Sequence, residues 1–127
     1  MRKETMKVCG AFVKGRPAKA ARTTTDGANL YLHGHRIAWW DIEQRNYSGK
    51  RILHICFCGY PSPTTKDRLN AVLYFLIGKC PFFTSNYQLY MDNKLRPVDE
   101  YEIITFDIDL MEEIAHDNTI TPKQIAA

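Results

Sequence analysis

The chain has 127 residues and a formal net charge of +3; 45% of its residues are hydrophobic and 24% are charged. These values are typical of globular domains and exclude a disordered chain. The length allows one hydrophobic core, so we expect a single domain over residues 1–127 with a polar, loose tail over residues 118–127. No apolar run could span a bilayer and no apolar signal segment follows the basic start, so we expect a cytosolic protein without membrane contact.

Charge is distributed unevenly along the chain. Residues 1–24 contain seven Lys and Arg residues and one acidic residue, whereas residues 99–117 contain eight acidic residues and no Lys or Arg. The two segments could neutralise each other or face water, or one of them could meet a charged partner.

The first elements are predicted from composition and turn residues. Residues 7–13 (KVCGAFV) have the apolar content of a strand, with Gly10 marking a bulge. Residues 15–27 (GRPAKAARTTTDG) lack an apolar period and contain Gly, Pro and Thr, which predicts an exposed loop. Asp26-Gly27 is a turn signal that leads into the next strand.

The stretch from Leu30 to Trp40 predicts a β-hairpin with a two-residue turn at Gly34, between His33 and His35. Strict alternation gives a core face formed by Leu30, Leu32, Ile37 and Trp39. The opposite face then carries Tyr31, Arg36, Ala38 and Trp40. Only one of the two adjacent tryptophans is needed by the core in this arrangement, so Trp40 is expected to be exposed.

Residues 51–58 (RILHICFC) are apolar on both faces, which predicts a central strand paired with residues 36–43 across a polar linker. Residues 65–77 predict the main helix, which ends at Gly78 and whose second half should be deeply packed. Thr64 and Asp67 resemble a capping box at its start. The apolar positions with helical spacing are Leu69, Val72, Leu73 and Leu76.

The last third predicts two more strands and a short helix. Residues 86–91 and 101–108 are predicted to be strands that pair with each other, either across a turn at residues 92–93 or across a later turn. Asp109 can cap a short helix over residues 109–116. The whole order predicts an α+β fold: an antiparallel sheet of five to six strands, one main helix packed on a face, and a short C-terminal helix.

Zinc binding is a minor alternative. The candidate ligands are His33, His35, His54, Cys56 and Cys58. Alternation along one strand places the last three on a common face, but no C-x-x-C or H-x-x-x-H spacing is present. We expect reduced, buried thiols, no metal and no cofactor.

Catalysis has equally little support. The cysteines lie in apolar strand contexts that raise thiol pKa values, and the sequence has no G-x-S-x-G elbow and no Gly-rich phosphate loop. We therefore expect a protein that is not an enzyme, and keep a zinc-dependent or thiol enzyme only as a third hypothesis.

Nucleic-acid binding is indicated by the basic N-terminal segment. Lys14-Gly15-Arg16-Pro17 resembles the Gly-Arg-Pro core of an AT-hook, in which an extended segment enters a narrow minor groove. The residues expected to contact DNA or RNA are Lys14, Arg16, Lys19 and Arg22, with Tyr31 and Trp40 as base-stacking residues.

The acidic C-terminal third suggests the opposite kind of partner. Carboxylates spread over a strand and a helix can imitate a phosphate backbone and occupy a basic channel on another protein. The candidate residues are Glu100, Glu102, Asp109, Glu112 and Glu113.

Two segments, TTTDGANLYLHGHRIAWW and PTTKDRLNAVL, resemble parts of small uncharacterised bacteriophage proteins. The shared features are a Thr-Asp-Gly turn, an Ile-Ala strand, and a helix start with Thr-Thr and Arg-Leu-Asn. This resemblance implies a phage accessory protein that binds a host nucleic-acid-handling or defence complex, such as an anti-CRISPR-type inhibitor, in the host cytosol. The alternative hypothesis is a nucleic-acid-binding module that uses the basic N-terminal loop.

Overall fold

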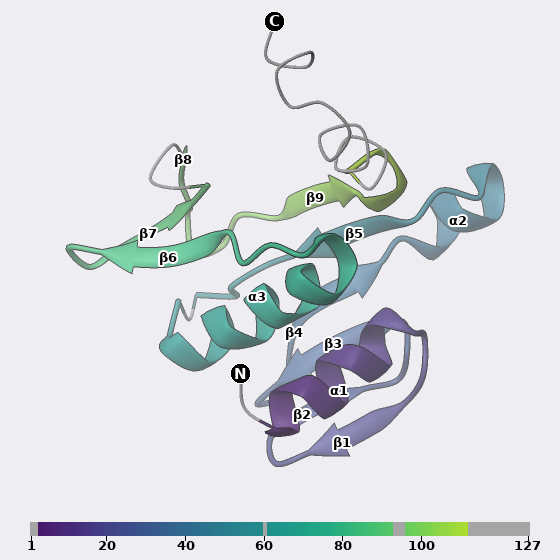
Figure 1. Ribbon diagram of the computed structural model, residues 1–127, viewed down its shortest axis with the longest axis horizontal. Coiled ribbons are helices and arrows are strands. Elements are labelled where there is room, and N and C mark those ends of the chain that lie inside the picture. Colours follow the sequence, from purple (N-terminus) through teal and green to yellow (C-terminus); the bar gives the residue numbers. More distant parts are fainter. Residues whose placement is uncertain (1–2, 60, 93–95, 112–127) are drawn as a thin grey trace, which may run out of the picture.

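The computed structural model describes residues 3–59, 61–92 and 96–111 (Figure 1). A six-stranded antiparallel sheet has the order β1-β2-β3-β4-β5-β9, and a three-stranded sheet has the order β6-β7-β8. The helices are α1 (Lys3–Val13), α2 (Ile42–Ser48) and α3 (Pro63–Ile77), with a helical turn over residues 108–111. The strands are β1 (Ala18–Ala20), β2 (Thr23–Thr25), β3 (Asn29–Leu32), β4 (His35–Trp40), β5 (Ile52–Ile55), β6 (Phe82–Ser85), β7 (Gln88–Met91), β8 (Arg96–Pro97) and β9 (Ile104–Asp107). The predicted α+β class is confirmed.

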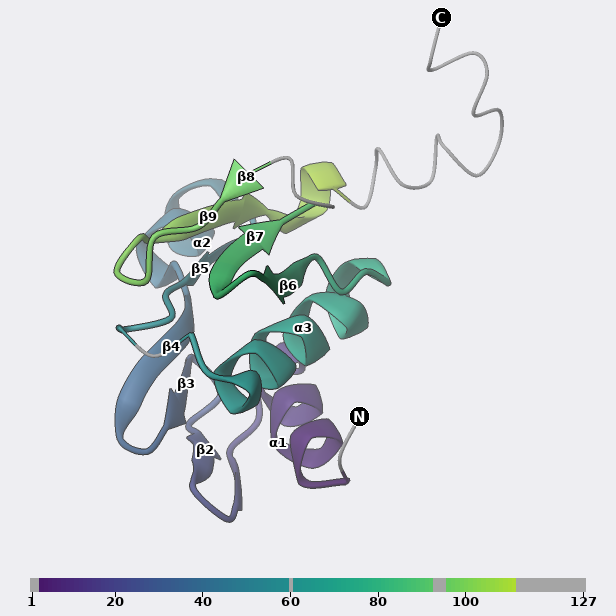
Figure 2. The same cartoon turned by 90° about the vertical axis from the view of Figure 1, so that its left-hand side faces the viewer.

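Two helices form a layer on one face of the six-stranded sheet. Helices α1 and α3 pack against each other; α1 also contacts β1, β2 and β3, and α3 contacts β4 and β6 (Figure 2). The core lies between this layer and the sheet, and its largest fully buried side chains include Phe12, Leu30, Leu53, Phe57 and Leu73. We call the sheet face toward α1 and α3 the inner face and the opposite face the outer face. Among the described residues, no helix packs across the outer face.

The predicted first strand is wrong, because residues 3–13 form helix α1. Its buried residues Thr5, Val8, Cys9 and Phe12 recur at helical spacing and lie on one side of the helix. Val, Cys and Phe each favour β structure, and a glycine within such a run is typical of a bulge, so composition alone favours a strand here. Gly10 instead lies within the helix, where Phe75 of α3 passes over it.

The predicted loop over residues 15–27 is also wrong, since it contains β1 and β2. Gly15 has a φ of 72° and ends α1. The Arg16 N–H donates to the Ala11 carbonyl at 2.9 Å, and the Gly15 N–H donates to the Phe12 carbonyl at 3.1 Å, which is a Schellman cap. The Gly-Arg-Pro sequence is thus the end of a helix, and it is not a free extended arm of the AT-hook kind.

The predicted hairpin of β3 and β4 is confirmed, with His33 and Gly34 as its two-residue turn, but the predicted faces are wrong beyond residue 36. Tyr31 pairs with Arg36 and Leu30 pairs with Ala38, so Ile37 is an extra residue in β4. This β-bulge shifts the phase of the side chains. Ile37 and Ala38 are both buried, Trp39 lies on the outer face, and Trp40 points into the core with an exposed fraction of 7%.

The predicted polar linker between β4 and β5 is helix α2. Asp41 is its N-cap and accepts a hydrogen bond from the Gln44 N–H, and Gly49 closes it with a φ of 73°. None of its residues is buried, so no apolar stripe marked the helix in the sequence. The antiparallel pairing of β4 with β5 is confirmed.

Helix α3 and its end at Gly78 are confirmed, but two details are wrong. The N-cap is Ser62, whose hydroxyl accepts from the Thr65 N–H, and not Thr64. The second half is not deeply packed all round, because Tyr74 is 50% exposed and Phe75 is 36% exposed.

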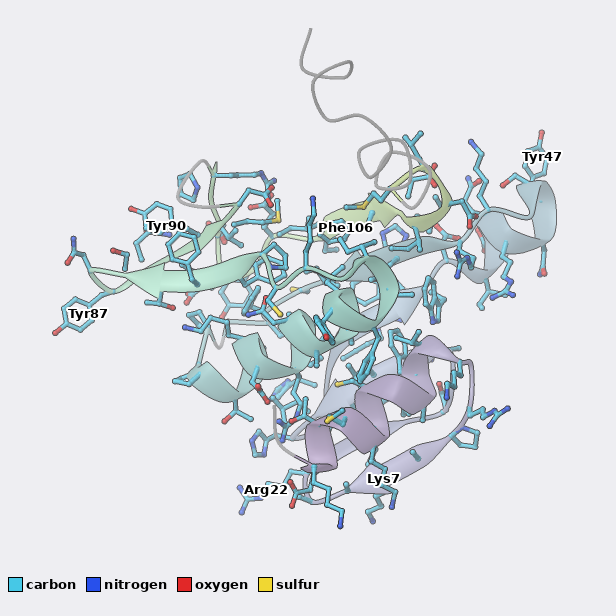
Figure 3. All side chains as sticks on the ribbon, in the orientation of Figure 1. Lys7, Arg22, Tyr47, Tyr87, Tyr90 and Phe106 are labelled. Carbon is cyan, nitrogen blue, oxygen red and sulfur yellow. The ribbon has the colours of Figure 1, made fainter. Side chains whose placement is uncertain are left out.

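The C-terminal third differs from the prediction in its pairing. Strand β9 pairs with β5 in the large sheet, whereas β7 pairs with β6 and β8 in the small one. Tyr87 does not share the buried face of Leu89 and Met91, because it stands exposed in the β6–β7 turn with a φ of 65° (Figure 3). Asp107 caps the turn over residues 108–111 by accepting from the Leu110 N–H, so Asp109 is not the cap. The predicted loose tail lies outside the described residues.

Substituting Gly10 with Ala tests the assignment of α1. A Cβ atom at this position would lie 3.9 Å from the Phe75 ring, an ordinary contact, and Ala favours a helix interior. We expect Gly10→Ala to raise the free energy of unfolding, measured by urea denaturation, by about 0.5–1 kcal/mol. The matched control is Gly15→Ala, which must adopt a positive φ and should lower stability by about 1 kcal/mol. A loss of stability in Gly10→Ala would contradict the helix.

Candidate functional site

The outer face of the large sheet carries two rows of side chains across neighbouring strands. In an antiparallel sheet, directly paired residues point to the same side. Strands β1 to β4 align Lys19, Thr24, Tyr31 and Arg36 in the first row. Strands β3, β4, β5 and β9 align Asn29, Trp39, His54 and Thr105 in the second row. Most of these side chains are polar, cationic or aromatic and at least partly exposed, so this face differs from the apolar inner face.

Arg36 and Trp39 form a cation–π pair on this face. The guanidinium carbon of Arg36 lies 4.1 Å from the centre of the Trp39 ring. Arg36 also donates a hydrogen bond from Nη1 to Asn29 Oδ1 at 3.4 Å. The pair brings the guanidinium plane against an indole ring, and guanidinium planes and aromatic rings both stack on nucleic-acid bases.

His54 is fixed beside Trp39 by hydrogen bonds at both ring nitrogens. Its Nδ1 lies 2.8 Å from Thr105 Oγ1, and its Nε2 lies 3.0 Å from Asp41 Oδ2. The Trp39 and His54 rings are 5.6 Å apart. The Gln44 N–H, together with the hydrogen bond from His54, holds the pKa of Asp41 below its usual value. Asp41 therefore joins the start of α2 to the outer face.

These side chains border a shallow hollow of about 290 Å³, which we call the tryptophan hollow. The side chains that can contact a ligand there are Asn29, Arg36, Trp39, Asp41, Glu43 and His54. It offers a ring, a guanidinium and hydrogen-bonding groups at one place.

A second hollow, of about 510 Å³, lies at the end of β4 and α1, and we call it the basic hollow. Its cations come from three separate segments and are Lys14, Arg45 and Arg51. Arg51 is paired with Asp109 at 2.9 Å, and hydrogen bonding from the Arg51 N–H lowers the pKa of Asp109. Asp26 also borders the hollow.

The six residues predicted to contact nucleic acid do not form one surface. Lys19 and Tyr31 lie on the outer face, Lys14 borders the basic hollow, and Arg16 and Arg22 are exposed elsewhere. Trp40 is excluded as a base-stacking residue, which corrects the prediction. Its ring stacks on Phe12 at 5.6 Å, and its indole N–H donates to the Phe12 carbonyl at 3.2 Å.

The acidic residues predicted to bind a protein partner are largely dispersed. Glu102 is paired with Arg96, and Asp109 is paired with Arg51. Glu100 is exposed and borders a polar hollow of about 540 Å³ together with Asp99, Glu102 and Tyr87, which we call the acidic hollow. Glu112 and Glu113 lie outside the described residues.

The histidines and cysteines offer little for catalysis or metal binding. Within the described ranges, no group of three or more His, Cys, Asp or Glu residues could hold a metal ion. The four cysteines are free thiols, but the predicted burial holds only for Cys9 and Cys56, because Cys58 is partly exposed and Cys80 is exposed. Burial raises the pKa of Cys9 to about 12 and that of Cys58 to about 11, so neither thiol forms a ready thiolate nucleophile.

His33 and His35 line a further hollow of about 460 Å³ near the start of α3. Its floor is apolar and includes Ile37 and Phe57, and its rim includes the hydroxyl-bearing Ser62 and Thr64.

Sequence reasoning missed Arg36, Trp39 and Arg45 as candidate site residues and considered His54 only as a possible zinc ligand. Arg36, Trp39 and His54 form a cluster on the outer face, and the bulge at Ile37 is what places Trp39 there. In a regular strand, residues three apart point to opposite faces. The spacing of Arg36 and Trp39 therefore indicates a pair on one face only when the bulge at Ile37 is taken into account.

The two tryptophans should differ in their fluorescence. We expect Trp39→Phe to leave a blue-shifted emission from Trp40 that acrylamide quenches poorly, with little change in stability. Trp40→Phe should leave a quenchable emission and lower the free energy of unfolding by about 1–3 kcal/mol, because the Phe12 carbonyl loses its buried donor. The reverse pattern would show that the bulge is placed wrongly.

No helix in the described part of the chain is long and apolar enough to cross a membrane.

Comparison with curated proteins and with solved structures gave no match. The model of a protein family described as Kyanoviridae Gp96 protein matches residues 1–120, nearly the whole chain, and it confirms the phage origin that the sequence motifs implied. The chain therefore belongs to the Gp96 protein family of the Kyanoviridae, which are cyanophages.

Proposed function

We propose that this phage protein binds single-stranded nucleic acid across the outer face of its large sheet. The observation that carries the proposal is the Arg36–Trp39 pair, with Tyr31 and Lys19 in the adjoining row. Aromatic rings with interleaved cations are the means by which proteins hold unpaired strands, because rings stack on bases and cations contact phosphates.

The shape of the face favours a single strand over a duplex. Tyr31 and Trp39 are only partly exposed and belong to a sheet surface, so neither ring forms an isolated wedge that enters a groove. Bases can reach such rings only when they are unpaired and turned toward the sheet. A duplex would present its phosphates and keep its base faces stacked inside.

We infer that the protein acts by binding and not by catalysis. The thiols of Cys9 and Cys58 are held protonated, and the imidazole of His54 is engaged at both nitrogens by Thr105 and Asp41. A phage protein of this kind would meet DNA, RNA or a host nucleoprotein complex in the cytosol of the infected cell.

The first experiment measures binding of fluorescent single-stranded DNA and RNA, and of the matching duplex, by anisotropy at low and at physiological salt. We expect the wild-type protein to bind the single strands more tightly than the duplex. Trp39→Leu and Arg36→Gln should each weaken binding about 5-fold to 100-fold, which corresponds to the loss of roughly 1–3 kcal/mol of stacking on one base.

Two exposed residues elsewhere serve as matched controls. Tyr87→Leu removes an aromatic ring from the small sheet, and Lys79→Gln removes a cation after α3, so both should bind as the wild type does. Equal losses in the controls, or duplex binding as tight as single-strand binding, would contradict a specific outer-face site.

Capture of a host protein is the second candidate function. The acidic hollow supports it, because Asp99, Glu100 and Glu102 border one concave surface beside the fully exposed Tyr87 (Figure 3). A basic segment of a host nucleic-acid-handling or defence complex would complement these charges, as an anti-CRISPR-type inhibitor requires.

Pull-down from nuclease-treated host lysate tests this candidate. We expect Glu100→Lys to lose a captured protein that wild type retains, because reversal of an exposed charge disrupts complementarity without disturbing the core. The control Glu4→Lys, an exposed acid on α1, should retain it. Identical capture by both variants would remove the acidic hollow from consideration.

A further inference from the structure

We propose that the basic hollow binds a backbone phosphate of the same strand whose bases lie on the outer face, with Lys14 and Arg45 as the contacting cations. This inference rests on the proposed binding of single-stranded nucleic acid and adds a second contact point to it. The two parts are separable, because stacking depends on rings and phosphate contacts depend on charge.

The cations of the basic hollow are gathered by the fold from distant parts of the sequence. Lys14 follows the last residue of α1, Arg45 lies on α2, and Arg51 immediately precedes β5. Within the described part of the chain, the side chains of Lys14 and Arg45 form no hydrogen bond or ion pair, whereas Arg51 is engaged by Asp109. Lys14 and Arg45 are thus the cations best placed to accept an anionic ligand.

The basic hollow adjoins the tryptophan hollow. Ala28, Trp40 and Ile42 border both, so the two spaces meet where β4 ends and α2 begins. A strand that stacks a base on the Arg36–Trp39 pair can continue round this end of the sheet and place a neighbouring phosphate beside Lys14 and Arg45.

Two carboxylates near the basic hollow offset part of its positive charge. Asp109 is compensated by Arg51, which it holds by a hydrogen bond to Nε at 2.9 Å and an ion pair to Nη2. Asp26 accepts hydrogen bonds from the Asn29 N–H at 2.7 Å and the Ala28 N–H at 2.9 Å. These bonds lower its pKa and orient it toward its own turn. Asp26 stays ionised, and the charge of Arg45 also acts on Asp109. The three cations of the hollow still outnumber the two carboxylates, which leaves a net positive charge there.

The wall of the hollow is built from tightly packed backbone. A Cβ atom on Gly27, which has a φ of 97°, would lie 2.6 Å from the Gly15 carbonyl oxygen. The segment after α1 and the turn before β3 are therefore held in contact, and Lys14 lies in the first of them. A phosphate would meet a cation at a fixed place and not on a freely moving loop.

The salt dependence of binding tests the inference. The affinity of wild type and of the double variant Lys14→Gln/Arg45→Gln for the same fluorescent single strand is measured over a series of salt concentrations. We expect the slope of log affinity against log salt to fall by about 0.7 for each phosphate contact removed. Quenching of Trp39 fluorescence at saturation should be unchanged, because the stacked base is still present.

The control is the double variant Lys7→Gln/Lys79→Gln, which removes the same charge from exposed positions on α1 and after α3. It should keep the wild-type slope. Thermal unfolding of each variant confirms that the fold is intact.

The other possible results would contradict either the phosphate site or the proposed function. A wild-type slope in the Lys14→Gln/Arg45→Gln protein overturns the phosphate site and leaves the proposed function standing. Equal reductions in both double variants mean that net charge alone acts, which also overturns a local site. Absence of single-strand binding by the wild-type protein overturns the proposed function and this inference with it.

Discussion

The side chain of Arg68 lies inside the molecule with an exposed fraction of only 4%, and it connects three elements. Its Nε donates to Thr23 of β2 at 3.0 Å, and its Nη1 donates to Thr5 of α1 and to Asp67 of α3. A buried guanidinium without partners would cost several kcal/mol, so the two helices and strand β2 must keep positions that satisfy it. This constraint holds α1 and α3 on the inner face and leaves the outer face open for the candidate site.

The bulge at Ile37 decides which aromatic ring that face presents. One extra residue in β4 exchanges the directions of all side chains that follow it. Trp40 then packs on Phe12 of α1 and contributes to the same helix–sheet contact that Arg68 stabilises. Trp39 is left outside, between Arg36 and His54. The core and the candidate site are therefore set by one local irregularity, and a change in the bulge would affect both.

Those parts of the fold that depend on local signals could be predicted from the sequence. The hairpin followed from Gly34 between two apolar strands, and the end of α3 followed from Gly78. Helix α2 could not be found by periodicity, since none of its residues is buried and only its caps, Asp41 and Gly49, define it. Helix α1 was missed because its residues favour strands individually, while their spacing of three and four places them on one helix face.

The candidate site could also be predicted only where local sequence patterns determine the direction of its side chains. Lys19 and Tyr31 were identified because they lie on regular strands, where alternation holds. Trp39 was assigned to the core, because strict alternation does not include a bulge. Four strands, β1 to β4, lie between Lys14 and Arg45 in the sequence, so no local pattern could bring these two residues together.

The ion pairs also explain how the uneven charge of the chain is used. Asp109 pairs with Arg51 and Glu102 pairs with Arg96, and both arginines lie outside the basic N-terminal segment. Within the described residues, no ion pair joins residues 3–24 to residues 99–111. The described part of the acidic third therefore does not neutralise the basic end by direct contact. Lys14 and Lys19 keep their charge beside the two surfaces that we assign to a nucleic-acid strand, and a polyanion is the kind of partner that such an arrangement attracts.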